Sequence, residues 1–96
     1  MRMADFIQVD GRDIGNIKIY ALSTCGWCKK TKEFFSKRGI RYQYIDVDRL
    51  EGHETDAVRQ QQMKFNRAGS FPTVVINDSE CIIGYDEDAL NGLIGE

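Results

Sequence analysis

The sequence has little of what marks a membrane, secreted or nucleic-acid-binding protein. It has one proline and three cysteines, and its apolar stretches, such as residues 20–22 and 74–76, are short. A helix that spans a bilayer needs about 20 apolar residues, so no such helix is expected. Thirteen basic against fifteen acidic side chains give a net charge of −2, without the positive excess that attracts phosphate groups. We therefore expect neither a membrane nor a nucleic acid as partner.

The N-terminus and the cysteines indicate a small protein of the cytoplasm. The first five residues contain no apolar core of a signal peptide, which predicts a reducing compartment. A disulfide framework requires a larger and even number of cysteines, whereas two of the three stand together as Cys25-Gly26-Trp27-Cys28. Ninety-six residues are enough for one core. We expect one domain at residues 16–96, preceded at residues 1–15 by an extension or short strand.

The pattern of apolar residues predicts strands that alternate with helices in an α/β fold. A crossover helix between the first two strands makes them parallel, and a turn at residues 77–79 makes the last two a hairpin, so the sheet is mixed. Residues 3–9 form either an additional strand or a flexible lead-in. The expected strands are residues 16–22, 41–46, 73–76 and 81–83, and the expected helices are residues 27–38, 54–65 and a last helix that starts after Asp86.

Local signals predict the helix ends and the buried faces. Ser23 and Thr24 offer capping side chains before the first helix, Gly39 ends it, and Asp86 caps the last one. The second helix is mostly polar and should bury only a thin stripe. That stripe consists of Ala57, Val58, Gln61 and Phe65, and the contact face of the last helix consists of Leu90, Leu93 and Ile94.

The pair Cys25 and Cys28 lies between the first predicted strand and the first predicted helix. Residues three apart are about one helical turn from each other, so the two sulfurs can form a disulfide in place. Such a short ring constrains the unfolded chain by only about 2 kcal/mol, which makes chemistry a better explanation than stability. Cys25 faces unpaired N–H groups and the positive end of the helix dipole, which favour the thiolate, and is the expected nucleophile. Cys28 lies deeper in the helix and is the expected resolving thiol.

An alternative interpretation of the same two cysteines is that they form half of a zinc site. The remaining ligands could come only from Cys81 and the single histidine, His53. Zinc sites usually combine two short ligand clusters, and these two residues are isolated in the chain. We expect Cys81 to be a small buried strand residue and His53 a surface residue, and we assign no metal ligand. Metal binding by the same thiols stays an alternative.

Three motifs together resemble the glutaredoxins of the thioredoxin-fold superfamily. They are residues 23–32 around the cysteines, residues 70–76 with Phe71-Pro72, and residues 84–86, and the resemblance covers residues 16–95. It implies a thioredoxin fold, with a four-stranded mixed sheet flanked by three helices and a cis Pro72 beside the cysteines. It also implies a thiol–disulfide oxidoreductase that reduces protein disulfides or glutathione mixed disulfides. The implied substrate-binding residues are Thr24, Trp27, Phe71, Pro72, Gly84, Tyr85 and Asp86.

The chain departs from the family pattern at several positions. Gly26 and Trp27 replace the usual Pro and Tyr between the cysteines, and Ile83 replaces the first glycine of a Gly-Gly pair. Leu22 stands where the family has a basic residue that binds the glutathione carboxylate. This change should weaken glutathione binding unless Lys29 or Arg67 supplies the positive charge instead. We therefore expect a thioredoxin-reductase-type flavoprotein to be a better reductant than glutathione.

The resemblance also bears on cofactors and assembly. Some glutaredoxins bridge an iron–sulfur cluster between two subunits with glutathione, usually with a single active cysteine. Because this chain has two, cluster binding is the last of the alternatives. We expect a monomer with no tightly bound cofactor.

Overall fold

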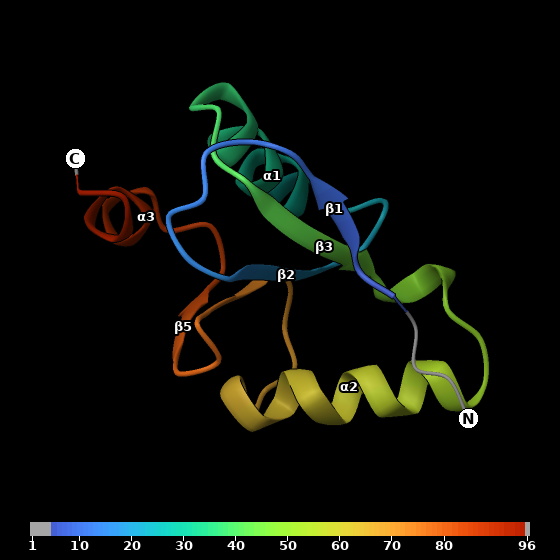
Figure 1. Ribbon diagram of the computed structural model, residues 1–96. Coiled ribbons are helices and arrows are strands. Elements are labelled where there is room, and N and C mark those ends of the chain that lie inside the picture. Colours follow the sequence, from blue (N-terminus) through green and yellow to red (C-terminus); the bar gives the residue numbers. More distant parts are fainter. Residues whose placement is uncertain (1–4, 96) are drawn as a thin grey trace.

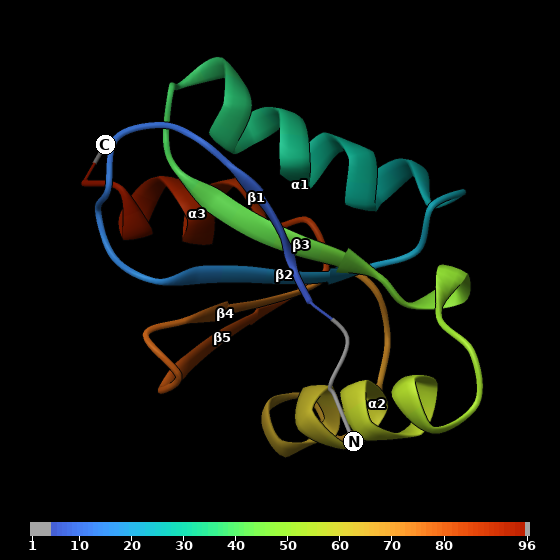
Figure 2. The same cartoon turned by 45° about the vertical axis from the view of Figure 1, so that its right-hand side comes forward.

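The computed structural model describes residues 5–95 as a mixed sheet with helices on both faces (Figures 1 and 2). The sheet has five strands in the order β1-β3-β2-β4-β5, of which β2 and β3 are parallel and the other neighbours antiparallel. This confirms the thioredoxin fold and adds one strand to the predicted four. The strands are β1 Ile7–Val9, β2 Ile17–Ala21, β3 Tyr42–Asp46, β4 Thr73–Ile76 and β5 Glu80–Ile83; the helices are α1 Gly26–Lys37, the 3-10 helix η1 Val47–Arg49, α2 His53–Phe65 and α3 Glu87–Leu93.

The N-terminal segment belongs to the sheet. β1 pairs with β3, with Ile7 opposite Tyr44, and the chain then passes so close to residues 40–41 that a Cβ on Gly11 would lie 2.6 Å from the Arg41 nitrogen. Glycine is therefore required at that crossing, because no side chain fits there. Of the predicted segment 3–9, residues 3 and 4 lie outside the described residues.

The face of the sheet under α1 and α3 carries the larger apolar core. Ile19 of β2, Phe35 of α1 and Leu90 of α3 are all fully buried there. Leu93 and Ile94 pack against the same cluster, which confirms the predicted contact face of the last helix. Figure 2 shows both helices on this side of the sheet.

The face under α2 is smaller and partly polar. Its apolar cluster includes Tyr20 of β2 and Val58 of α2, as the alternating pattern of β2 and the stripe on α2 predicted. Phe65 also packs against this cluster as predicted, but one position of the stripe needs a correction, because Gln62 is fully buried and Gln61 is not. Gln62 can be buried since its amide donates to the Ser70 carbonyl at 2.9 Å and to the Thr73 hydroxyl at 3.2 Å.

Two predicted ends of the helices are confirmed. Gly39 follows the last residues of α1 with φ at 64°, and its N–H donates to the Ser36 carbonyl at 3.1 Å. Asp86 caps α3 by accepting the Ala89 N–H at 3.0 Å. No helix within residues 5–95 is long and apolar enough to cross a membrane.

Candidate active site

Cys25 is itself the N-cap of α1. Its Sγ accepts the backbone N–H of Cys28 at 3.2 Å, and its own N–H donates to the Leu22 carbonyl at 3.2 Å. The prediction that Ser23 and Thr24 cap the helix is therefore wrong by one to two residues, because the sulfur occupies the capping position. This geometry places the Cys25 sulfur at the positive end of the helix, beside an N–H group that can stabilise a thiolate.

Cys28 differs from Cys25 in its surroundings although both are free thiols. Cys28 is 1% exposed and belongs to the apolar core, whereas Cys25 is half-buried. Burial, and next the hydrogen bond with Cys25, raises the pKa of the Cys28 thiol to about 12. At neutral pH Cys28 is thus a protonated and shielded thiol, and Cys25 is the accessible one.

Two carboxylates, at the end of β3 and in η1, bind the cysteine loop and helix α1 although they lie far from them in the sequence. The Asp48 carboxylate accepts the Ser23 N–H at 2.8 Å and also the Ser23 hydroxyl. These hydrogen bonds lower the pKa of Asp48 below its ordinary value. Asp46 at the end of β3 binds the Lys32 ammonium of α1 at 3.0 Å. The sequence carried no signal for either contact, since the partners are separated by a helix and a strand.

The loop before β4 presents Phe71 and Pro72 through a polar network. The Phe71-Pro72 peptide bond is cis, as the resemblance implied. Thr73 donates its hydroxyl hydrogen to the Ser70 carbonyl at 2.8 Å and accepts the Asn66 amide at 2.9 Å. The Pro72 carbonyl accepts the Gly84 N–H at 2.9 Å, which brings the end of β5 to the proline.

Most of the predicted substrate-binding residues surround one hollow of about 270 Å³. Trp27 is 58% exposed, and its ring stacks on Tyr85 with centroids 5.8 Å apart and planes 20° apart. The stack holds an otherwise mobile indole as one wall of the hollow. The lining residues are Trp27, Phe71, Pro72, Gly84 and Tyr85.

A second hollow of about 200 Å³ is lined by Thr24 and Cys25. Leu22 lines it, and so does Lys29, whereas Arg67 does not. Lys32 also lines it, a residue that the sequence did not single out, but its ammonium already binds Asp46 and lies 4.0 Å from the Tyr44 ring centroid. The cation that faces this hollow without a carboxylate partner among residues 5–95 is therefore Lys29.

Neither Asp86 nor the two residues considered as alternative metal ligands, His53 and Cys81, lines either hollow. Asp86 uses its carboxylate as the cap of α3, His53 is exposed at the start of α2, and Cys81 is half-buried in β5, where burial raises the pKa of its thiol. Within residues 5–95 no three His, Cys, Asp or Glu side chains lie close enough to hold a metal ion.

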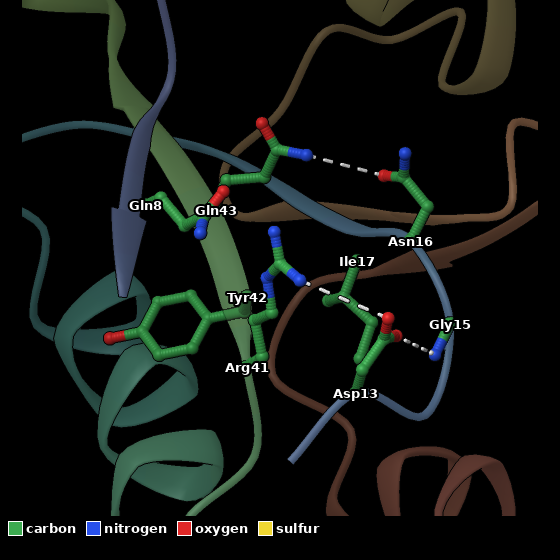
Figure 3. A pocket seen from close by; sticks show the side chains of 8 residues that line it. All are labelled: Gln8, Asp13, Gly15, Asn16, Ile17, Arg41, Tyr42 and Gln43. Atoms are coloured by element: carbon green, nitrogen blue, oxygen red, sulfur yellow. Dashed lines mark hydrogen bonds and ion pairs between the residues drawn. The ribbon is translucent and has the colours of Figure 1, made fainter. Parts of the chain in front are cut away.

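Another hollow, of about 320 Å³, lies at the opposite end of β2 from the cysteines (Figure 3). It is polar, and Figure 3 shows the ion pair between Arg41 and Asp13, 3.9 Å apart, and the Gln43 amide that donates to Asn16 at 3.4 Å. None of the residues of the three motifs lines it. The candidate site is therefore the smaller pair of hollows beside Cys25.

Comparison with known proteins shows which family the chain is similar to. The model of the Glutaredoxin family matches residues 17–81, which include both cysteines and the Phe71-Pro72 loop. An uncharacterised glutaredoxin-like 8.6 kDa protein in a rubredoxin operon of Clostridium pasteurianum is 31% identical over 78 residues, which are 81% of this chain and 96% of that protein. Among solved structures, Methanosarcina acetivorans methanoredoxin has 41% sequence identity to this chain, and its crystal structure superposes with a TM-score of 0.86 over 90% of each chain. The glutaredoxin of Methanosarcina mazei Go1 is 40% identical, with a TM-score of 0.87 over 98% of this chain and 92% of that one.

Proposed function

Because the chain belongs to the glutaredoxin family, we propose that it is a thiol–disulfide oxidoreductase with Cys25 as nucleophile and Cys28 as resolving thiol. The observation that carries this proposal is the contrast between the two thiols. Cys25 is accessible at a helix N-terminus, and Cys28 is 1% exposed with a pKa raised to about 12. Thiolates are the attacking species in disulfide exchange, so the contrast supports Cys25 as the thiol that reacts first.

The reaction runs in two exchanges. The Cys25 thiolate attacks one sulfur of a substrate disulfide, a new S–S bond forms, and the other substrate sulfur leaves as a thiolate. The Cys28 thiol then gives up its proton to solvent or to the departed thiolate and attacks the Cys25 sulfur, which releases the second substrate sulfur as a thiolate. The substrate has gained two electrons, and Cys25 and Cys28 are left as a disulfide. An external thiol or dithiol must then reduce that disulfide.

The surroundings of Cys25 suit an extended disulfide substrate. The Phe71-Pro72 backbone and the Trp27–Tyr85 stack line the apolar hollow on one side, and Lys29 lines the other hollow. We propose that the substrates are protein disulfides or glutathione mixed disulfides. No group of metal-ligating side chains within residues 5–95 favours the metal alternative.

Trapping the intermediate tests the two roles. A Cys28→Ser variant should retain the first exchange and stop before the second, so that it accumulates one substrate half on Cys25. Intact-mass and peptide mass spectrometry after reaction with a disulfide detects the adduct. Cys81→Ser is the matched control and should leave no adduct. An adduct on Cys81, or an equal adduct in a Cys25→Ser variant, contradicts the assignment.

For the reductant we propose a thioredoxin-reductase-type flavoprotein rather than glutathione. Leu22 lines the hollow next to Cys25 where the family has a cation, and a charge-assisted hydrogen bond to a carboxylate contributes about 1.5–3 kcal/mol. Two coupled NADPH assays on one preparation compare the donors. Fast turnover with glutathione and glutathione reductase, and none with thioredoxin reductase, contradicts this choice.

A further inference from the structure

The apolar hollow next to Cys25 has cations placed on two of its aromatic walls. The Lys30 ammonium lies 4.9 Å from the Trp27 ring centroid, and the Arg59 guanidinium lies 5.1 Å from the Phe71 ring centroid. The five residues that line the hollow carry no charge themselves. An occupant therefore meets an apolar surface first and positive charge at two of its borders.

The two cations are held to different degrees. Arg59 donates to the Gln62 side-chain oxygen at 2.9 Å and to the Gly69 carbonyl at 2.8 Å, so its position is fixed. Lys30 is exposed, and its ammonium lies over the Trp27 ring; it also lines a neighbouring hollow with Glu33 and Glu87 but forms no ion pair among residues 5–95. An ammonium on a ring keeps its charge available to a carboxylate from outside, because the ring supplies no full negative charge.

The sign of charge changes across the site. Helix α1 and its C-cap carry five basic residues and one acidic one, although the whole chain has a net charge of −2. The start of α3, on the Tyr85 side of the hollow, is acidic through Asp86, Glu87 and Asp88. A negative group on a substrate is therefore expected on the α1 side, over Trp27 and Lys30.

The walls are already in position before a partner binds. The Trp27–Tyr85 stack orders an exposed indole, so that little side-chain entropy remains to be lost on binding. Tryptophan and tyrosine in such positions are the side chains that contribute most to protein interfaces. The volume of about 270 Å³ accommodates one large apolar side chain.

We propose, resting on the proposed function, that this hollow selects protein substrates whose disulfide cysteine is flanked by a large apolar residue and then an acidic residue. The apolar side chain enters between Trp27, Phe71 and Tyr85, and the carboxylate binds Lys30. The partner is thus an extended, acidic segment of a protein, and Trp27 and Lys30 are its specificity-determining residues. Small neutral disulfides use neither contact.

Three peptide disulfides test the proposal. They are the symmetric disulfides of Glu-Leu-Cys-Leu-Glu, Lys-Leu-Cys-Leu-Lys and Glu-Gly-Cys-Gly-Glu, each mixed with the fully reduced protein. Oxidation of the Cys25–Cys28 pair is followed by acid quench and mass spectrometry. Bis(2-hydroxyethyl) disulfide is run in parallel with the unchanged protein.

Two variants should each lower a different rate ratio, and a control variant should change neither. Lys30→Glu should lower the rate ratio of the Glu-Leu peptide to the Lys-Leu peptide by about fivefold or more, as expected for an exposed charge pair. Trp27→Ala should lower the ratio of the Glu-Leu peptide to the Glu-Gly peptide by about tenfold, because it removes one apolar wall. Lys64→Glu, which alters the net charge equally on the exposed side of α2, should leave both ratios unchanged.

Each outcome is decisive. Equal rates for the three peptides with the unchanged protein, or equal effects of Lys30→Glu and Lys64→Glu, overturn the proposal. If bis(2-hydroxyethyl) disulfide and all peptides fail to oxidise Cys25, the proposed function itself fails. Oxidation by the small disulfide without discrimination among peptides rejects the specificity surface and leaves the oxidoreductase.

Discussion

The two faces of the sheet hold the two halves of the site by different forces. Under α1 and α3, apolar side chains such as Ile19 and Phe35 are fully buried and carry the helix that presents the cysteines. Under α2, buried Gln62, Asn66 and Thr73 hold the loop that ends in Phe71 and Pro72. Apolar packing is non-directional and graded, whereas a buried hydrogen-bond network positions atoms but fails when one partner is lost. Apolar packing therefore positions the helix with the nucleophile, whereas hydrogen bonds position the loop with Phe71 and Pro72.

The largest expected effect comes from the apolar face. Phe35→Ala removes a fully buried ring and should lower the free energy of unfolding by about 3–5 kcal/mol. Phe65→Ala on α2, where the ring is partly buried, should lower it by less. Urea denaturation of both variants measures the difference. Equal losses would contradict the claim that the α1 face dominates stability.

The next prediction distinguishes two roles of the polar network under α2, which are to position the substrate loop and to stabilise the fold. Gln62→Leu removes the amide that donates to Ser70 and Thr73, and unpaired buried groups should lower the free energy of unfolding by about 1–3 kcal/mol. We also expect slower exchange with peptide disulfides while alkylation of Cys25 by iodoacetamide stays unchanged, since that thiol belongs to the other half. Exposed Gln60→Leu is the control and should change neither. A parallel loss of both reactivities in Gln62→Leu would show that the halves are coupled.

A smaller effect is expected at Leu22, which packs against the α2-side cluster and lines the hollow of Cys25. Leu22→Lys restores a cation for the glutathione carboxylate and should raise glutathione-dependent kcat/KM by about tenfold, equivalent to about 1.4 kcal/mol. Leu22→Met, which adds no charge, is the control. If both variants behave alike, Lys29 already supplies the cation.

The smallest effect concerns the contact that ties the cysteine loop to the segment after β3. The hydrogen bonds from Ser23 lower the pKa of Asp48 below its ordinary value of 3.8, so they stabilise the fold above that value. This contribution is lost as the pH falls through the lowered pKa, where the carboxylate becomes protonated. Asp48→Asn should therefore be slightly less stable than the unchanged protein at neutral pH, and the difference should vanish in acid. A difference that grows in acid, measured by urea midpoints, has the wrong sign for this contact.

Local patterns of residues were enough to predict the order of elements and the chemistry of the motif. Residues 73–76 were predicted as a short buried strand with the bounds that β4 has, because such a run depends only on neighbouring residues. The spacing of Cys25 and Cys28 at a helix start likewise predicted an accessible and a shielded thiol, since both properties follow from the first turn of one helix. The motifs also predicted the family and the cis Pro72.

Only the tertiary structure decided which distant residues complete the site. The stack of Trp27 on Tyr85 and the hydrogen bonds of Ser23 with Asp48 join positions far apart in the chain, and no local pattern encodes them. Gln62 rather than Gln61 became buried because the Ser70 and Thr73 acceptors lie on its side of α2. The pairing of β1 with β3 was also decided by tertiary contacts, because a strand of three residues gains its stability from the strand beside it.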